Sequence, residues 1–341
     1  MGNATDYCDQ AYTVTFNFLY RSSQFCTFFL SLLSVYPLIY LISVKLCHST
    51  FNINVKILFM LYFIQILISV FANILVFGHH VIVPILASAK CDLIIDPMKY
   101  RIFQYVGIFG ISCPMLTILG VTVERLCAIA LARCYEHIRA PIGLFIGFIA
   151  IAGDILLSCL IFEDEKFDKP SVSYFLIPET SGPKMNVLFY SLLAINSVNF
   201  VFNFVLVRIN MALKARWRNS LTVRYQIEEN IVTTTFSTCI SFFHVLFFSL
   251  YLVFTLAVRL FAAGFLKTNA DWLVVRGIYV TIPTYNVIIG IVSCVILRHI
   301  RRQKIDKVSS EVTMKYRGLE GAQLHQNAIM NVWNSKANAF K

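Results

Sequence analysis

Between Arg101 and Glu124 the chain reads IFQYVGIFGISCPMLTILGVTV, which is 22 residues without a charged side chain. A helix of about 20 apolar residues, rising roughly 1.5 Å per residue, crosses a hydrocarbon layer about 30 Å thick. A strand of a membrane barrel would need only about 10 residues and would alternate in polarity. This stretch is twice as long and does not alternate, so it predicts a membrane-spanning helix.

Six further stretches have the same character. Together the seven predict helices at about 25–46, 57–77, 102–125, 141–162, 186–208, 230–258 and 277–298. Of the 341 residues, 58% are hydrophobic and 14% are charged, where soluble proteins average about 25%. So few charges cannot cover that much apolar surface in water. We therefore expect an all-α integral membrane protein, a seven-transmembrane-helix bundle, and exclude soluble enzymes, disordered chains and small disulfide-rich secreted domains.

The basic residues predict the orientation of the bundle. With the N-terminus outside, 19 of the 29 Lys and Arg residues fall on the inner side and 10 on the outer side, as the positive-inside rule requires. The net charge of +11 is thus explained without nucleic-acid binding. The expected layout is an extracellular tail (1–24), a seven-transmembrane domain (25–300) and a cytoplasmic tail (301–341). Asn3, in the Asn-Ala-Thr sequon, is a predicted glycosylation site on the outer side.

Ten cysteines are present, and most lie in apolar runs or on the inner side, where thiols stay reduced. Cys8 and Cys91 are the two in polar outer segments, so elimination favours a Cys8–Cys91 disulfide. A Cys91–Cys159 pair and two free thiols remain alternatives. The second outer loop, 163–186, contains no cysteine, so the usual receptor disulfide to that loop cannot form.

The third predicted helix ends in Glu124-Arg125, which resembles the E/D-R-Y region of rhodopsin-like G-protein-coupled receptors, with Leu126 in place of Tyr. The resemblance implies that Arg125 is held by an acid at rest and later meets the G protein. We expect the coupling surface to comprise Glu124, Arg125, Arg216, Arg218 and Arg224. The alternative is that these charges only reach the membrane interface.

Ile282-Pro283-Thr284-Tyr285-Asn286 in the seventh run is similar to a permuted N-P-x-x-Y region. Proline frees a backbone carbonyl and permits a kink. Pro283, Tyr285 and Asn286 are therefore candidates for a conformational switch, with an ordinary helix kink as the alternative.

The string Leu221-Thr-Val-Arg-Tyr-Gln-Ile-Glu-Glu-Asn230 resembles nematode serpentine chemoreceptors of the Sra superfamily, and the Srab branch is the closest. The segment 48–63 and Glu124-Arg125 followed by Tyr135-Glu136 support the resemblance. It implies a chemosensory G-protein-coupled receptor in the plasma membrane, in the cilia of sensory neurons, with a small-molecule ligand and a heterotrimeric G protein as partners. Contact with membrane lipid and homo- or heterodimers are further expectations, and no cofactor or metal is implied.

The ligand site is expected in the outer half of the bundle, where aromatic walls and a few polar groups suit a small molecule. The candidates are Tyr105, Phe109, Ser112, Asn196, Phe248, Tyr251 and Tyr279. Asp154 and His244 lie within the membrane and have either a structural or a ligand-binding role.

Other functions are weighed on the same residues. A channel or transporter would need several charged residues inside the membrane to form a pathway, and this chain has one such residue, Asp154. A membrane metalloenzyme would need clustered histidines, and His79-His80 is an isolated pair. A receptor for an internal amine or peptide has the same fold and stays open. We therefore expect a receptor and not an enzyme.

Overall fold

The computed structural model describes residues 4–131, 141–168, 170–178, 180–216, 221–265, 268–278, 280–315, 322–323, 326–327 and 330. Within this part of the chain, seven helical stretches are long and apolar enough to cross a membrane, and the chain is a multi-pass membrane protein. The chain divides into two compact units, residues 1–294 and 295–341. Below, "outer" means the end of the first unit that carries the N-terminus, following the orientation that the charges predict.

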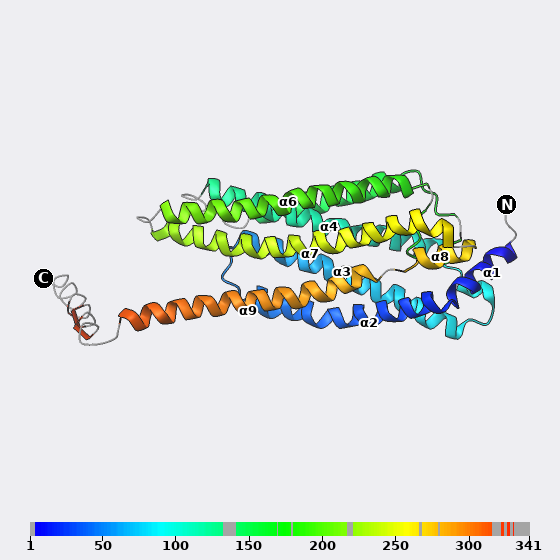
Figure 1. Cartoon of the computed structure of the whole chain (residues 1–341), viewed down its shortest axis with the longest axis horizontal. Coiled ribbons are helices and arrows are strands. Elements are labelled where there is room, and N and C mark those ends of the chain that lie inside the picture. Colours follow the sequence, from blue (N-terminus) through cyan, green and yellow to red (C-terminus); the bar gives the residue numbers. More distant parts are fainter. Residues whose placement is uncertain are drawn as a thin grey trace. The chain divides into compact units, whose positions relative to one another are not determined.

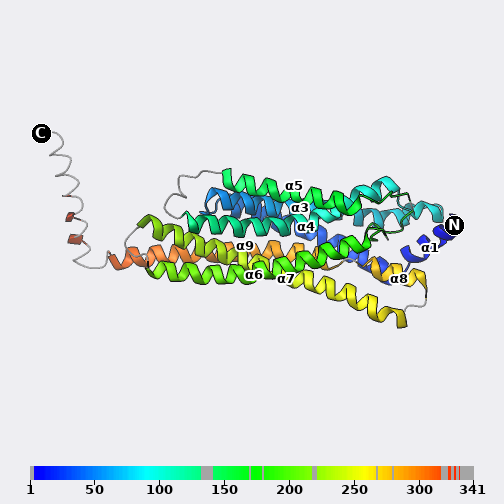
Figure 2. The same ribbon diagram turned by 90° about the horizontal axis from the view of Figure 1, so that it is seen from above.

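The helices are labelled in Figure 1. Their bounds are α1 Ala4–Thr15, α2 Phe18–Tyr40, a π-helical turn η1 Leu41–Leu46, α3 Ile53–Leu86, a 3-10 turn η2 Lys90–Leu93, α4 Pro97–Ala130, α5 Pro141–Phe162, α6 Gly182–Arg216, α7 Leu221–Phe265, α8 Asn269–Arg276 and α9 Thr281–Lys315. In the first unit, α3 packs against α2, α4 and α5, α4 also contacts α6 and α7, and α6 lies along α7 (Figures 1 and 2).

Polar caps set where the spanning helices begin. Asp96 accepts a hydrogen bond from the backbone N–H of Lys99 (3.1 Å), and Pro97 occupies the first helical position. Asn17 and Asn52 cap α2 and α3 in the same way. Helices α3, α4, α6, α7 and α9 are longer than the charge-free runs because a run marks only the part in hydrocarbon, whereas the helix continues into water. The outer tail also holds a helix of its own, α1.

The seventh span is two helices rather than one. Helix α8 ends at Gly277, and α9 begins at Thr281. A side chain at Gly277 would collide with the ring of Tyr20, and the side-chain amide of Gln24 donates to the carbonyl of Gly277 (3.2 Å). Pro283 lies in the first turn of α9, where its missing N–H is not needed. Pro283 thus lies at the beginning of a helix, whereas the alternative reading of the sequence placed it at a kink within one.

Candidate functional site

A buried ion pair lies at the inner end of α4. The guanidinium of Arg125 donates to both carboxylate oxygens of Glu124 (2.5 and 2.6 Å). Its Nη1 donates to the side-chain oxygens of Asn230 (2.7 Å) and Thr233 (3.0 Å), both on α7. Arg125 is 1% exposed and Glu124 is fully buried. A buried charge is tolerated only when it is paired and hydrogen-bonded, and this cluster meets both needs while joining α4 to α7. We call Glu124, Arg125, Asn230 and Thr233 the inner latch.

The string ending in Glu228-Glu229-Asn230 has three different partners. Glu228 pairs with Lys214 of α6 (2.8 Å), and Glu229 accepts from the backbone N–H of Asn52 before α3. Asn230 belongs to the inner latch. Successive residues on a helix point about 100° apart, so three neighbouring side chains reach three neighbouring segments. The inner end of α7 is thus bonded to α6, to α4 and to the segment before α3.

Only part of the expected coupling surface can be placed. Glu124 and Arg125 are brought together in the inner latch. Arg218 lies outside the described residues, as do the side chains of Arg216 and Arg224.

A second polar cluster lies deeper in the bundle. The hydroxyls of Tyr62 (α3) and Tyr285 (α9) are 2.5 Å apart, and each lies close to Nε2 of His244 (α7), at 3.0 and 3.1 Å. All three are buried. His244 and Tyr285 border a cavity of about 20 Å³ that Asn286 also lines, large enough for one water. His244 therefore belongs to a network that joins α3, α7 and α9, which we call the tyrosine–histidine cluster.

Asp154 has a partner on the neighbouring helix. Its carboxylate accepts a hydrogen bond from the hydroxyl of Ser112, which also donates to the carbonyl of Ile108 (2.8 Å). Asp154 is fully buried between α5 and α4. A carboxylate in hydrocarbon is costly without such a partner, so the arrangement gives Asp154 and Ser112 a role in holding α5 against α4.

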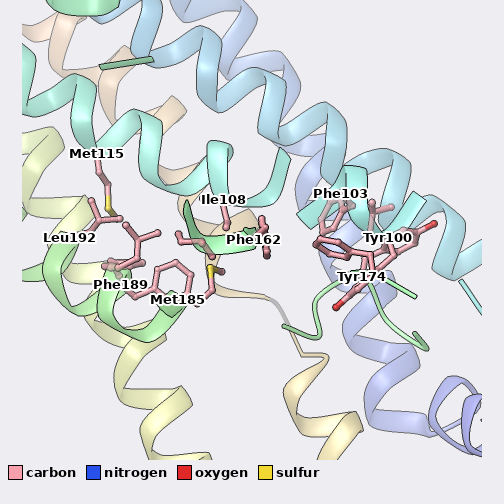
Figure 3. Packing of buried hydrophobic residues seen from close by; sticks show 14 of the residues in the cluster. Tyr100, Phe103, Ile108, Met115, Phe162, Tyr174, Met185, Phe189 and Leu192 are labelled. Carbon is pink, nitrogen blue, oxygen red and sulfur yellow. The ribbon is translucent and has the colours of Figure 1, made fainter. Parts of the chain in front are cut away.

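The outer half of the bundle contains a cavity of about 420 Å³, which we call the outer cavity. Its walls come from α3, α4, α6, α7, α8 and the second outer loop. Its lining includes Ser69, Asn73, Phe103, Gln104, Gly107, Ile108, Ile111, Tyr174, Phe175, Leu176, Ile177, Pro178, Asn186, Phe189, Tyr251, Phe254, Thr255 and Arg276. Figure 3 shows Phe103 beside Tyr174, with Ile108 and Phe189 further along the same buried cluster.

The second outer loop covers this cavity without a disulfide. The side-chain amide of Gln104 donates to the backbone carbonyls of Tyr174 (2.7 Å) and Leu176 (3.0 Å), and the hydroxyl of Tyr100 donates to Leu176. The backbone N–H of Ile95 donates to the carbonyl of Ser171 (2.9 Å). Burial, and then the Asp96 carboxylate, raise the pKa of Tyr174, so its phenol is neutral at physiological pH. Hydrogen bonds thus attach the loop to α4.

The N-terminal helix is attached separately. Cys8 of α1 and Cys91 of η2 form a disulfide, and Lys90 pairs with Asp9 beside it (2.6 Å). This is the pair that elimination favoured, and Cys159 is a free thiol in the structure. Asn3 lies outside the described residues.

Of the seven expected ligand residues, Tyr251 lines the outer cavity. Phe248 packs on Phe189 and Tyr251 and borders the smaller cavity below. Tyr105 packs on Phe162, and the amide of Asn196 donates to the carbonyl of Leu192 (2.9 Å). The others lie elsewhere: Ser112 bonds to Asp154, Phe109 is not among the lining residues, and Tyr279 lies outside the described residues.

The face of α4 that meets the outer cavity was missed by sequence reasoning. It carries Phe103, Gln104, Gly107, Ile108 and Ile111, and the expected face carried Tyr105, Phe109 and Ser112. Both sets have helical spacing, and a rotation of the helix by one or two residues exchanges them. The sequence did contain one signal for the correct face. Gln104 is a polar side chain within an apolar run. Polar side chains in membrane spans form hydrogen bonds inside the protein, so Gln104 marks an inward-facing side of the helix.

Seven spans, an outer cavity under a loop and a buried Glu-Arg pair at the inner end of the third span define a receptor of the G-protein-coupled class. The family model of the "Serpentine type 7TM GPCR chemoreceptor Srb" matches residues 16–248. "Serpentine receptor class beta-6" of Caenorhabditis elegans is 61% identical over 98% of this chain and 99% of its own length. "Serpentine receptor class beta-1" and "class beta-3" of the same nematode are 33% and 34% identical, over 99% and 96% of this chain and 100% and 96% of their own lengths. The chain belongs to the Srb family of chemoreceptors.

This finding corrects the assignment to the Sra superfamily and its Srab branch, which is wrong. The string at 221–230 misled because its last three residues hold contacts between helices, which a receptor of this architecture needs whatever its branch. Membership in a chemoreceptor family also shows that the chain is not an enzyme.

Proposed function

We propose that this receptor binds a small-molecule cue in the outer cavity and activates a heterotrimeric G protein through the inner ends of α4, α6 and α7. We place it in the plasma membrane of sensory neurons, in their cilia. The observation that carries the proposal is the inner latch, in which a buried arginine at the inner end of α4 is bonded to α7. A G protein binds where the inner ends of α4 and α7 separate, and the inner latch opposes that separation.

Helix α7 connects the two ends physically. Tyr251 lines the outer cavity, His244 belongs to the tyrosine–histidine cluster, and Asn230 belongs to the inner latch. Ile111 of α4 borders both the outer cavity and the small cavity beside His244. A ligand that moves α7 therefore changes the contacts of this helix at the outer cavity, in the tyrosine–histidine cluster and in the inner latch. This arrangement is a physical basis for coupling between two sites.

The lining of the outer cavity bears on the class of ligand. Its volume of about 420 Å³ is within the usual range for small molecules, roughly 300–1,000 Å³, and too small for most peptides. Among the described lining residues none is acidic, and Arg276 is the charged one. A cationic amine would lack a counter-charge. The side-chain N–H₂ of Asn73, 4% exposed and without a partner in the described residues, calls for a ligand with a hydrogen-bond acceptor.

The test is a cell line that expresses the receptor, screened with candidate cues and read out by calcium or cAMP. We expect Arg125→Ala to abolish the response at equal surface density. Arg208→Ala, at an exposed position of α6, is the matched control and should respond normally. A full response from Arg125→Ala would refute the assigned coupling site.

A further inference from the structure

The outer cavity continues sideways between α6 and α7. A smaller cavity of about 20 Å³ lies there, and it shares Ile177, Asn186, Phe189, Tyr251 and Thr255 with the outer cavity. We call this smaller cavity the side neck. It has room for about one water, so it is a constriction rather than an open channel.

The far side of the side neck faces the bilayer. Its remaining residues include Tyr190 of α6 and Leu256 of α7, which are 50% and 45% exposed. Both lie within candidate membrane spans, Gly182–Lys214 and Gln226–Val258, so we place their exposed surfaces against the bilayer. Figure 2 shows the outer end of α7 running away from α6.

The second outer loop borders the outer cavity on its aqueous side, and Gln104, Tyr100 and Ile95 hydrogen-bond to the backbone of this loop. Moving the loop aside breaks these hydrogen bonds together. The side neck is bordered toward the bilayer by the side chains of Tyr190 and Leu256. Side-chain rotation is a faster motion than rearrangement of a loop.

We propose that the ligand is an uncharged lipophilic molecule that reaches the outer cavity from the outer leaflet of the bilayer, through the side neck. The inference rests on the proposed function, because it assumes that the outer cavity is the ligand site. None of the eight residues that line the neck, all of them described, carries a charge. A charged molecule would lose its hydration there without compensation, so the neck selects neutral molecules.

The experiment uses two photolabels with the same aryl-diazirine, one carrying a benzyl alcohol and the other a benzoate. The full-length receptor, in nanodiscs of phosphatidylcholine, is mixed with each probe and flashed after set delays. Mass spectrometry then measures labelling over time at Phe103 and Ile108, which line the outer cavity and not the side neck. We expect the alcohol to label these residues and the benzoate to label them many-fold less.

Variants of the neck test the route. Leu256→Trp narrows the neck and should slow labelling at Phe103 several-fold, and Tyr190→Ala widens the neck and should speed that labelling. Val253→Trp, at a 64% exposed position of α7 outside both cavities, is the matched control and should leave the rate unchanged.

Each failure has a distinct meaning. Equal labelling by the benzoate, or an unchanged rate in Leu256→Trp and Tyr190→Ala, would overturn the lateral route while leaving the outer cavity as the ligand site. No labelling of the outer cavity by either probe would overturn the outer cavity itself, and with it the proposed function.

Discussion

The guanidinium of Arg125 in α4 donates a 2.7 Å hydrogen bond to Asn230 of α7, a residue 105 positions further along the chain. One buried charge therefore joins the helix that bears the Glu-Arg pair to the helix that lines the outer cavity. This bond opposes separation of the inner ends of the two helices.

Weakening the inner latch is expected to raise signalling without ligand. Thr233→Ala and Asn230→Ala each remove one acceptor from the charged guanidinium of Arg125, worth about 1.5–3 kcal/mol, or roughly a 10- to 150-fold shift toward the open state. Basal cAMP or calcium at matched surface density is the measurement. Thr235→Ala, whose hydroxyl bonds only to its own helix, should behave as wild type. Lower basal output in both latch variants would contradict the assignment of the latch to the resting state.

The tyrosine–histidine cluster is expected to behave as one unit. Tyr62→Phe and Tyr285→Phe each remove a hydroxyl that bonds both to the other tyrosine and to His244. The double variant should therefore lower the melting temperature of the purified receptor by less than the sum of the single variants. Tyr36→Phe, at a 77% exposed position, is the control. Strict additivity would show that the hydroxyls act independently.

The loop cover is expected to depend on Gln104. Gln104→Leu removes both hydrogen bonds to the loop and leaves two carbonyls without that partner, at a cost of about 1–3 kcal/mol. Amide hydrogen exchange in residues 170–178 should become faster. Ile102→Ala, on the exposed face of α4, should leave exchange unchanged. Unchanged exchange in Gln104→Leu would mean that packing around Tyr174 holds the loop.

The disulfide is expected to be found by mass spectrometry of the non-reduced protein as a peptide linking Cys8 to Cys91. Cys8→Ser should speed hydrogen exchange in α1 and leave residues 170–178 protected, because the loop is attached elsewhere. Cys159→Ser tests the other candidate pair and should change neither region. A peptide linking Cys91 to Cys159 would decide for that alternative.

The orientation is expected to be N-terminus outside. An epitope placed after residue 2 should be stained on intact cells, and one at residue 341 should be stained only after permeabilisation. The excess of Lys and Arg on the inner side is the physical reason. The reverse staining pattern would invert the bundle and with it the outer and inner sites.

The number of spans was predictable because a charged side chain in hydrocarbon costs several kcal/mol, so the chain marks its own membrane boundaries. The break at Gly277 was not, since it depends on Tyr20 and Gln24, about 250 residues earlier. The Glu124-Arg125 pair was visible as adjacent charges. Its partners on α7 were not, because sequence alone does not give the rotation of one helix against another. Because the rotation of each helix is not given by the sequence, most residues proposed from the sequence for the ligand site do not line the outer cavity.

The bonds that Gln104 and Tyr100 make to the second outer loop all end on backbone carbonyls, those of Tyr174 and Leu176. Every amino acid supplies the same carbonyl, so these bonds place no demand on the side chain at either position. Tyr174 is constrained separately, by the packing of its ring on Phe103. The attachment of the loop to α4 therefore leaves the identity of residue 176 open to substitution, with no matching change at Gln104 or Tyr100. A disulfide in this place would reserve one loop position for cysteine.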